Sequence, residues 1–276
     1  QFKQANQAYA NKEYPKAIGF YDATLGLDAN PDPRVSTTVH FYRGSSNHLQ
    51  FKPGDDSDEN FEFLDKAIED YEKAMELSAA NSDEFAMVGV YEQYAMEQLA
   101  AIYRDNLEDF PNAVSMFQGL IEYDPETPER YYALADVYER YHDPDEMPLI
   151  EQAIESYKKP VEMSPEDPLV YRQVANFLNK YGQFENTMMW LGRARDVNEA
   201  DPEGYYLMSV HYWDKVYRDP DLTAGDKRSF IDLGLEQLDQ ALGINDEYVD
   251  ALIYKNLLLR EKAKVEPRNS DALTAE

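Results

Sequence analysis

Apolar and small residues recur along the chain at alternating steps of three and four positions. One pattern places an aromatic residue, a small residue and then an aromatic residue or leucine at such steps. It occurs as Tyr14, Ala17 and Tyr21, as Phe110, Ala113 and Phe117, and as Phe184, Thr187 and Leu191. These steps place side chains on one stripe of an α-helix. The pattern therefore predicts amphipathic helices that pack through seams centred on small residues.

A second pattern predicts the helices that precede these. Residues 128–141 and 168–181 align without a gap, and each segment has an initial proline, a central alanine and a final tyrosine: Pro128, Ala135 and Tyr141; Pro168, Ala175 and Tyr181. Proline in the first turn of a helix removes only a donor that has no partner there. Pro125 and Pro165 follow the small residue of the second helix by twelve positions and indicate where that helix ends.

These residues resemble the tetratricopeptide repeat family, whose units are helix–turn–helix pairs of about 34 residues. The small residues of the predicted second helices are Ala17, Ala67, Ala113, Ala153, Thr187 and Gly234. Only the step from Ala153 to Thr187 is 34 residues; the others are longer, so most units carry insertions. The resemblance implies an all-α, right-handed α-α superhelical solenoid of about six helix pairs plus a final helix.

The predicted repeat domain covers residues 1–265, and a polar tail covers 266–276. Its units span approximately 1–31, 34–80, 84–125, 128–166, 168–201 and 202–246, and the final helix spans 248–264. Insertions are expected between the helices of three units, at 51–60, 143–147 and 219–226. All three are expected to lie on one edge of the solenoid.

Composition narrows the classes of partner. The chain has 54 Asp and Glu against 26 Lys and Arg, a net charge of −28. Such a charge repels phosphate backbones and anionic lipid headgroups, which argues against nucleic acid and membrane surfaces as partners. It favours cationic partners.

The 22 tyrosines suit helix seams, because the ring packs inside while the hydroxyl reaches a partner or water.

The sequence leaves the compartment open. It has no cysteine, which excludes disulfides and thiolate sites, and no apolar run long enough to span a membrane. The chain begins at Gln1, inside a predicted helix and without an initiator methionine. We therefore expect that a preceding segment, such as a signal peptide, is missing, and a bacterial cell envelope or periplasm is the favoured location.

Catalytic and cofactor chemistry are not indicated. The four histidines lack zinc-ligand spacing; His40 and His48 could share a helix face, but packing or surface roles are favoured. Asp56, Asp58 and Asn60 begin a calcium-loop pattern, yet Ala67 stands where a bidentate acid is required. No glycine-rich phosphate loop is present. We expect no enzyme activity, no metal and no cofactor.

The resemblance also implies a ligand surface, because first helices line the concave groove of this fold. Helical spacing then selects residues that flank the seams and face the groove. The predicted partner-binding residues are Tyr94, Arg104, Tyr132, Asp136, Arg140, Arg172, Asn176, Asn179, Lys180, Tyr206 and Trp213. The same spacing adds Glu97, Asp105, Glu139, Leu169, Val210 and Asp214.

Two groups within this set have alternative interpretations. Arg172 and Asn176 resemble the basic and amide pair with which some family members hold a peptide carboxylate, although Leu207 stands where a further amide is expected. Alternatively, Arg172 and Arg140 form ion pairs with Asp136 and Glu139. Trp213 and Tyr206 form either an apolar pocket for an anchor residue or part of a helix seam.

The favoured function is therefore a non-catalytic scaffold that binds a peptide or protein in the groove, through a basic segment or a free carboxylate. A second hypothesis is self-assembly through an exposed face of the last helix, with Ile253, Leu257 and Leu258 as its apolar residues. A third is an enzyme, or a protein that binds sugar or metal in a closed polar pocket.

Overall fold

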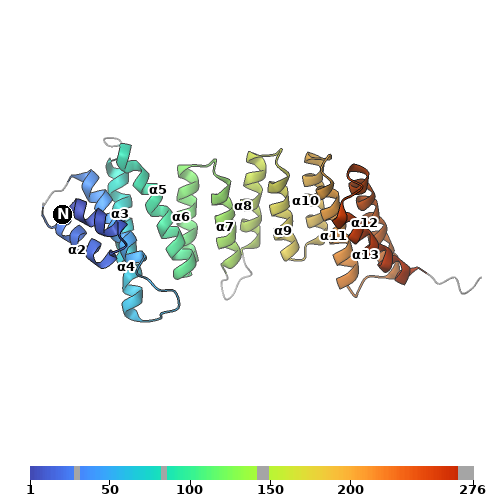
Figure 1. The fold of residues 1–276 in the computed structure, drawn as a ribbon, viewed down its shortest axis with the longest axis horizontal. Coiled ribbons are helices and arrows are strands. Elements are labelled where there is room, and N and C mark those ends of the chain that lie inside the picture. The colour runs from blue at the N-terminus through green and yellow to red at the C-terminus, as the bar shows by residue number, and fades with distance from the viewer. Residues whose placement is uncertain (28–31, 82–85, 142–148, 267–276) are drawn as a thin grey trace, which may run out of the picture. The chain divides into compact units, whose positions relative to one another are not determined.

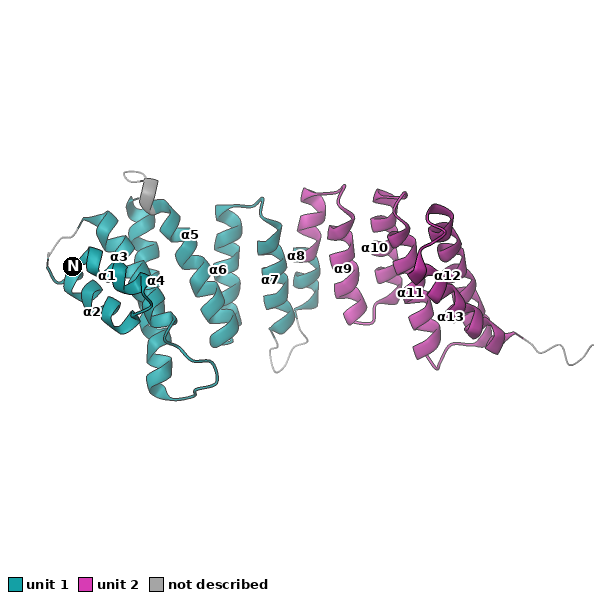
Figure 2. Cartoon of the chain, in the orientation of Figure 1, with its two compact units in different colours: residues 1–156 teal, residues 157–276 magenta. Residues whose placement is uncertain are grey.

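The computed structural model describes the chain except residues 28–31, 82–85, 142–148 and 267–276 (Figure 1). Throughout the described residues the secondary structure is helical, without β-strands, which confirms the predicted all-α class. The chain divides into two compact units, Gln1–Ser156 and Tyr157–Glu276 (Figure 2). The division falls within one helix, α8 (Ile150–Met163).

In the first unit, helices pack against their neighbours in the sequence, α1 on α2, α3 on α4 and α5 on α6. A short π-helical turn, η1 (Ile102–Asn106), continues α5. The helices are α1 (Phe2–Ala10), α2 (Tyr14–Leu25), α3 (Pro33–His48), α4 (Asp58–Asn81), α5 (Ala86–Ala101), α6 (Phe110–Tyr123) and α7 (Pro128–Arg140).

In the second unit, α9 packs on α10, α11 on α12, and the last helix packs on both α11 and α12. The helices are α9 (Pro168–Lys180), α10 (Phe184–Val197), α11 (Pro202–Arg218), α12 (Ala224–Ile244) and α13 (Val249–Val265). Five of the predicted helix pairs thus pack as pairs among the described residues: α1 with α2, α3 with α4, α5 with α6, α9 with α10, and α11 with α12. The insertion expected at 51–60 lies mostly in the α3–α4 loop, the one at 219–226 includes the α11–α12 loop, and the one at 143–147 lies outside the described residues.

Several helices begin at an Asp-Pro pair, for a simple physical reason. The aspartate carboxylate accepts a hydrogen bond from a backbone N–H two residues later, and the proline occupies a position that needs no donor. The pairs are Asp32-Pro33, Asp167-Pro168 and Asp201-Pro202, and their Oδ1 atoms accept from Arg34, Leu169 and Glu203 at 2.9–3.0 Å.

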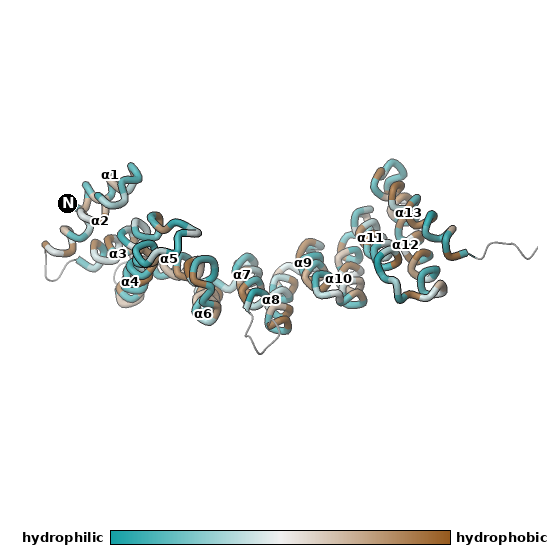
Figure 3. Tube along the Cα trace, turned by 90° about the horizontal axis from the view of Figure 1, so that it is seen from below, coloured by the Kyte–Doolittle hydropathy of each residue, from teal (hydrophilic) through white to brown (hydrophobic). Residues whose placement is uncertain are grey.

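The small residues of the second helices lie in buried positions. Five of them, Ala17, Ala67, Ala113, Ala153 and Thr187, are fully buried. At the sixth, Gly234 on α12, a Cβ atom would lie 2.7 Å from Cδ1 of Leu258 and 3.2 Å from Cβ of Tyr212. Small side chains at these positions let neighbouring helices approach. Hydropathy accordingly alternates along the helices (Figure 3).

Candidate functional site

The predicted partner-binding residues all lie on first helices of the pairs and divide between the two units. Tyr94 lies on α5, Arg104 on η1, and Tyr132, Asp136 and Arg140 on α7. In the second unit, Arg172, Asn176, Asn179 and Lys180 lie on α9, and Tyr206 and Trp213 on α11. Each group is therefore a separate candidate surface.

The arginines of the first unit are matched to acids. Arg140 Nη1 lies 3.1 Å from Asp105 Oδ1 and 3.8 Å from Asp136 Oδ2, and Arg140 Nη2 donates to the backbone oxygen of Arg104 at 3.1 Å. Arg104 also pairs with Asp105, at 2.7 Å. The hydrogen bond from Arg104, together with that from Arg140, lowers the pKa of Asp105 despite its partial burial. These contacts hold η1 against α7.

Rings of α6 lie beneath the same two arginines. The guanidinium carbon of Arg104 lies 5.5 Å from the centroid of the Phe117 ring, and that of Arg140 lies 5.7 Å from the Phe110 centroid. These are cation–π distances. Both guanidinium groups therefore make their ion pairs and ring contacts at the junction of η1, α6 and α7.

Tyr94 belongs to an aromatic surface along the first helices of this unit. Its ring lies 6.2 Å from that of Phe41 on α3 and 6.3 Å from that of Tyr91 on α5. Tyr9 of α1 packs on Tyr42 of α3 at 5.0 Å. Burial, followed by the neighbouring Tyr91 and Tyr9, raises the pKa of Tyr42. Of these rings only Tyr94 was among the predicted binding residues, because the spacing of aromatic residues does not distinguish an exposed surface from a helix seam.

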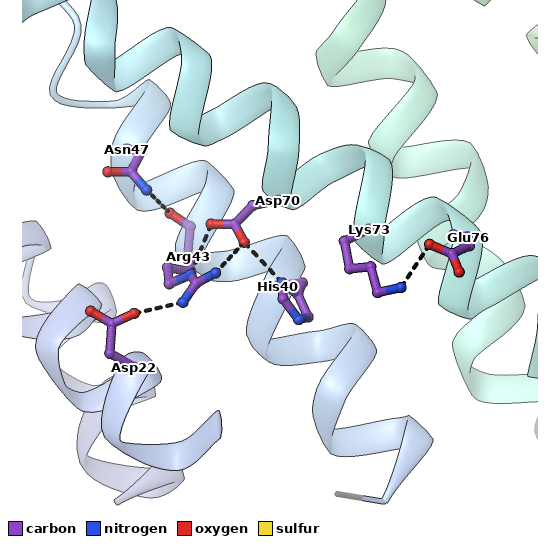
Figure 4. A network of polar contacts seen from close by, with 7 residues as sticks. All are labelled: Asp22, His40, Arg43, Asn47, Asp70, Lys73 and Glu76. Carbon is purple, nitrogen blue, oxygen red and sulfur yellow. Dashed lines mark hydrogen bonds and ion pairs between the residues drawn. The ribbon is translucent and has the colours of Figure 1, made fainter. Parts of the chain in front are cut away.

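A charged network that the sequence analysis missed lies between α2, α3 and α4 (Figure 4). The side chain of Asp70 on α4 is only 4% exposed. Arg43 of α3 donates to both of its oxygens, at 2.9 and 2.7 Å, and to Asp22 of α2 at 2.6 Å. His40 Nδ1 lies 2.8 Å from Asp70 Oδ1. Burial lowers the pKa of Arg43, but the hydrogen bonds to Asp70 and Asp22 outweigh it and raise the pKa above its ordinary value.

A cavity of about 440 Å³ opens beside this network, with Arg43, Asp22 and Asp70 among its lining residues and Ile18 and Phe63 among its apolar ones. Both histidines of α3 are in packed positions. His40 is held by Asp70, whereas His48 packs edge-on against Tyr71 at 6.4 Å and burial lowers its pKa. The residues of this charged network therefore join α2, α3 and α4.

Arg172 pairs with residues that were not predicted as its partners. Its Nη1 lies 2.8 Å from Glu203 Oε2, and its Nη2 lies 3.5 Å from Asp201 Oδ2, while the side chain is 14% exposed. The predicted pairing of Arg172 with Asp136 or Glu139 is wrong, because the N-terminal turn of α11 brings two acids onto α9. Asp201 serves two purposes: Oδ1 caps α11 and Oδ2 faces Arg172. Asn176, the other half of the predicted carboxylate clamp, is exposed.

Asn179 lines a cavity of about 250 Å³ between the C-terminal ends of α9 and α11. Its charged lining residues are paired: Lys215 with Asp219 at 2.9 Å, and Arg218 with Asp214 at 2.5 Å. His211 also lines it, and burial lowers the pKa of its imidazole. Lys180 is exposed at the end of the same helix.

Tyr206 and Trp213 belong to a larger aromatic group, here called the aromatic face: Tyr206, Trp213 and Tyr217 of α11, with Tyr248 and Tyr254 at α13. Tyr254 packs against both predicted residues, with centroids 5.4 Å from Tyr206 and 5.6 Å from Trp213. Trp213 stacks on Tyr217 at 5.1 Å with an interplanar angle of 13°. The step of four residues between Trp213 and Tyr217 was the signal available in the sequence.

One property of the aromatic face favours binding. Tyr217 is 62% exposed although its ring stacks on Trp213. Trp213 itself is half-buried, and its Nε1–H is buried without an acceptor among the described residues, so the ring faces and not this donor are open to a partner.

Acidic residues surround the aromatic face. Burial, then Tyr254 and Asp250, raises the pKa of Tyr206; burial, then Glu203 and Asp250, raises that of Tyr248. The negative field at these hydroxyls disfavours their ionisation. Ring faces beside carboxylates suit the guanidinium or ammonium group of a partner.

The side-chain amide of Asn60, in the first turn of α4, is hydrogen-bonded to the acidic loop that precedes this helix. Asn60 Oδ1 accepts from Lys52 N–H at 2.9 Å, and Nδ2 donates to the carbonyl oxygens of Lys52 and Asp55 at 3.0 and 2.8 Å. Asn60 therefore fixes the loop shape.

Across the described residues, no helix combines the length and apolar character that crossing a bilayer demands.

Comparisons with known proteins give structural similarity only. No family model and no curated protein sequence matches the chain. Among solved structures, the chain is similar to the C-terminal part of a TPR repeat-containing protein from Cytophaga hutchinsonii, with 15% identity, 99% of this chain and 98% of that chain covered, and a TM-score of 0.49.

Two further solved structures are similar at lower scores. YrrB, described as a TPR protein with an unusual peptide-binding site, has 18% identity, covers 82% of this chain and 92% of its own, and has a TM-score of 0.40. The TPR2AB domain of yeast Sti1, in complex with pHSP90, has 15% identity, coverages of 94% and 96%, and a TM-score of 0.35. The chain is thus an all-α assembly of helix pairs, similar to solved tetratricopeptide-repeat proteins.

Proposed function

We propose that this protein is a non-catalytic binding module that takes a basic segment of a partner protein on the aromatic face of its second unit. The observation that carries the proposal is the stack of the half-buried Trp213 ring on the Tyr217 ring, because Tyr217 is 62% exposed. Aromatic residues at the centre of a surface are typical binding hot spots.

The charges near the aromatic face favour a basic segment over a free carboxylate. Arg172, the cation proposed for a carboxylate clamp, is already matched by Glu203 and Asp201. Asp250 and Glu203 leave a negative field at Tyr206 and Tyr248. A lysine or arginine side chain could lie over a ring and pair with one of these acids.

Binding rather than catalysis is supported by the pairing of charged side chains in the predicted site. Arg104 and Arg140 in the first unit and Arg172 in the second each contact a carboxylate at 2.7–3.8 Å. An arginine stays protonated and does not serve as a general acid or base, and a guanidinium that is already matched to a carboxylate is poorly placed to hold an anionic substrate group. Binding would therefore depend on the rings and on the acids around them.

The test is capture of lysine- and arginine-containing peptides from an array, followed by calorimetry on those captured. Replacing Trp213 and Tyr217 by alanine should weaken binding by at least about tenfold, because truncation of a hot-spot residue costs about 2 kcal/mol or more. Tyr123→Ala is the matched control, since Tyr123 is an exposed tyrosine on α6 of the other unit. Unchanged affinity in the double variant, with helicity retained, would show that the aromatic face is not the binding surface.

A further inference from the structure

The last helix exposes an apolar stripe. Val249, Leu252, Ile253 and Leu259 of α13 are 47–63% exposed, and their spacing places them on one side of the helix. Ala251 and Leu258, on the opposite side, are fully buried. Leu258 fits against Gly234 of α12, so the prediction that it belongs to the exposed face is wrong.

The register of α13 shows what kind of element fits this stripe. The third residue of α11, Gly204, and that of α13, Ala251, are both buried. Counting from them, Ser209 and Tyr212 of α11 correspond to Asn256 and Leu259 of α13. Ser209 and Tyr212 face α12 at Gly234. The equivalent side of α13 is therefore shaped to receive a helix.

The charges of α13 select the partner helix. Acids gather at its N-terminal end, at Asp246, Glu247 and Asp250. At its C-terminal end three bases, Arg260, Lys262 and Lys264, outnumber two acids, Glu261 and Glu266. Lys262 pairs with Asp232 at 2.8 Å and Lys264 with Glu261 at 2.6 Å, so Arg260 is the base available to a second copy. A second α13 laid antiparallel against the first would place each acidic end beside a basic end. Arg260 has no ion-pair partner within the described part of its unit, and it lies on the same side as Val249, Ile253 and Asn256.

We propose that the exposed stripe of α13 is a two-fold interface between copies of this chain, with the two helices antiparallel about Asn256. The helix has 17 residues and is about 25 Å long, so one helix pair buries well below the ~800 Å² per partner of a standard interface. The association is therefore weak and depends on concentration. Its apolar residues lie on the side of α13 that faces away from α11, whereas Asp250 also borders the aromatic face. The interface is therefore tested with residues other than Asp250, so that its failure is distinguishable from failure of the proposed function.

Sedimentation velocity on the purified chain from about 1 to about 200 µM tests the interface. The expected result is a monomer–dimer equilibrium that Leu252→Glu with Leu259→Glu shifts to monomer, with unchanged helicity because both side chains are exposed in the monomer. Leu233→Glu on α12 is the matched control, since Leu233 is an exposed leucine outside the stripe, and it should leave the dimer unchanged. A monomer at every concentration, or a mass that keeps growing beyond the dimer, overturns the proposal.

A charge exchange tests the antiparallel arrangement. One variant carries Asp246→Lys and Glu247→Lys, both at exposed positions before α13, and a second carries Arg260→Glu and Lys264→Glu. Each alone should be monomeric, because like charges meet at both ends of the pair. An equimolar mixture should restore the dimer, because opposite charges then meet at both ends. A mixture that stays monomeric, or single variants that dimerise as well as the original chain, contradicts this arrangement.

Discussion

At the scale of single residues, the buried carboxylate of Asp70 and the guanidinium of Arg43 together join three helices. It accepts from Arg43 through both oxygens and contacts His40, while Arg43 continues to Asp22. A buried ion pair contributes little net stability when both partners are present, because both charges lose hydration. Removing one partner is costly, because the other charge is left without its match.

We predict that Asp70→Ala lowers the free energy of unfolding by about 3 kcal/mol, as expected when a buried pair loses one partner. Asp22→Ala is the control: the Asp22 side chain is 55% exposed, and solvent replaces most of its interaction with Arg43, so its loss should cost less than ~1 kcal/mol. Urea denaturation followed by circular dichroism measures both. Equal losses of unfolding free energy in the two variants would mean that the burial of Asp70 does not determine its contribution to stability.

The residue scale also shows why some contacts could not be predicted. The chain contains 54 acidic residues, so any arginine has many plausible partners in the sequence. The partners of Arg172 are 29 and 31 residues away and are brought to it by the start of the next first helix. Helical spacing places a side chain on a face of its own helix. It does not say which residue of the adjacent helix meets it.

At the scale of elements, the small residues carried most of the predictable information. Ala17, Ala67, Ala113, Ala153 and Thr187 are fully buried, and at Gly234 the packed partner leaves little room for a Cβ, so spacing of three and four residues around these positions located the helices. The Asp-Pro pairs located several of their first turns. The exposed side of α13 was only partly predictable, because Leu257 and Leu258 are adjacent in the sequence and only packing against Gly234 shows that Leu258 is buried.

Gly234 gives a direct test of seam packing. Gly234→Ala should destabilise the protein by about 1–3 kcal/mol, because the new Cβ would lie 2.7 Å from Leu258 and 3.2 Å from Tyr212 within a buried seam. Gly243→Ala on the same helix is the control. Nothing lies within 4 Å of a Cβ there, so alanine should stabilise by about 0.5–1 kcal/mol through helix propensity. Denaturant midpoints that move in the same direction for both variants would contradict the seam argument.

At the scale of the whole molecule, the net charge of −28 acts on every encounter with a partner. A field of this size attracts a basic segment over distances comparable to the Debye length, about 10 Å at 0.1 M salt, before any ring contact forms. The contacts at the aromatic face then determine how long the segment stays. Salt screens the first process more strongly than the second, because the stacked rings bind through apolar contact.

For a captured basic peptide, we therefore predict that the association rate falls by about tenfold or more between about 50 and about 500 mM NaCl, while the dissociation rate changes much less. Surface-immobilised peptide with the chain in solution measures both rates. Trp213→Ala should show the opposite division, with faster dissociation and an unchanged salt dependence of association, because the ring acts after the encounter. Association that does not respond to salt would mean that the acidic field does not guide the partner, and the basic character of the segment would have to be abandoned.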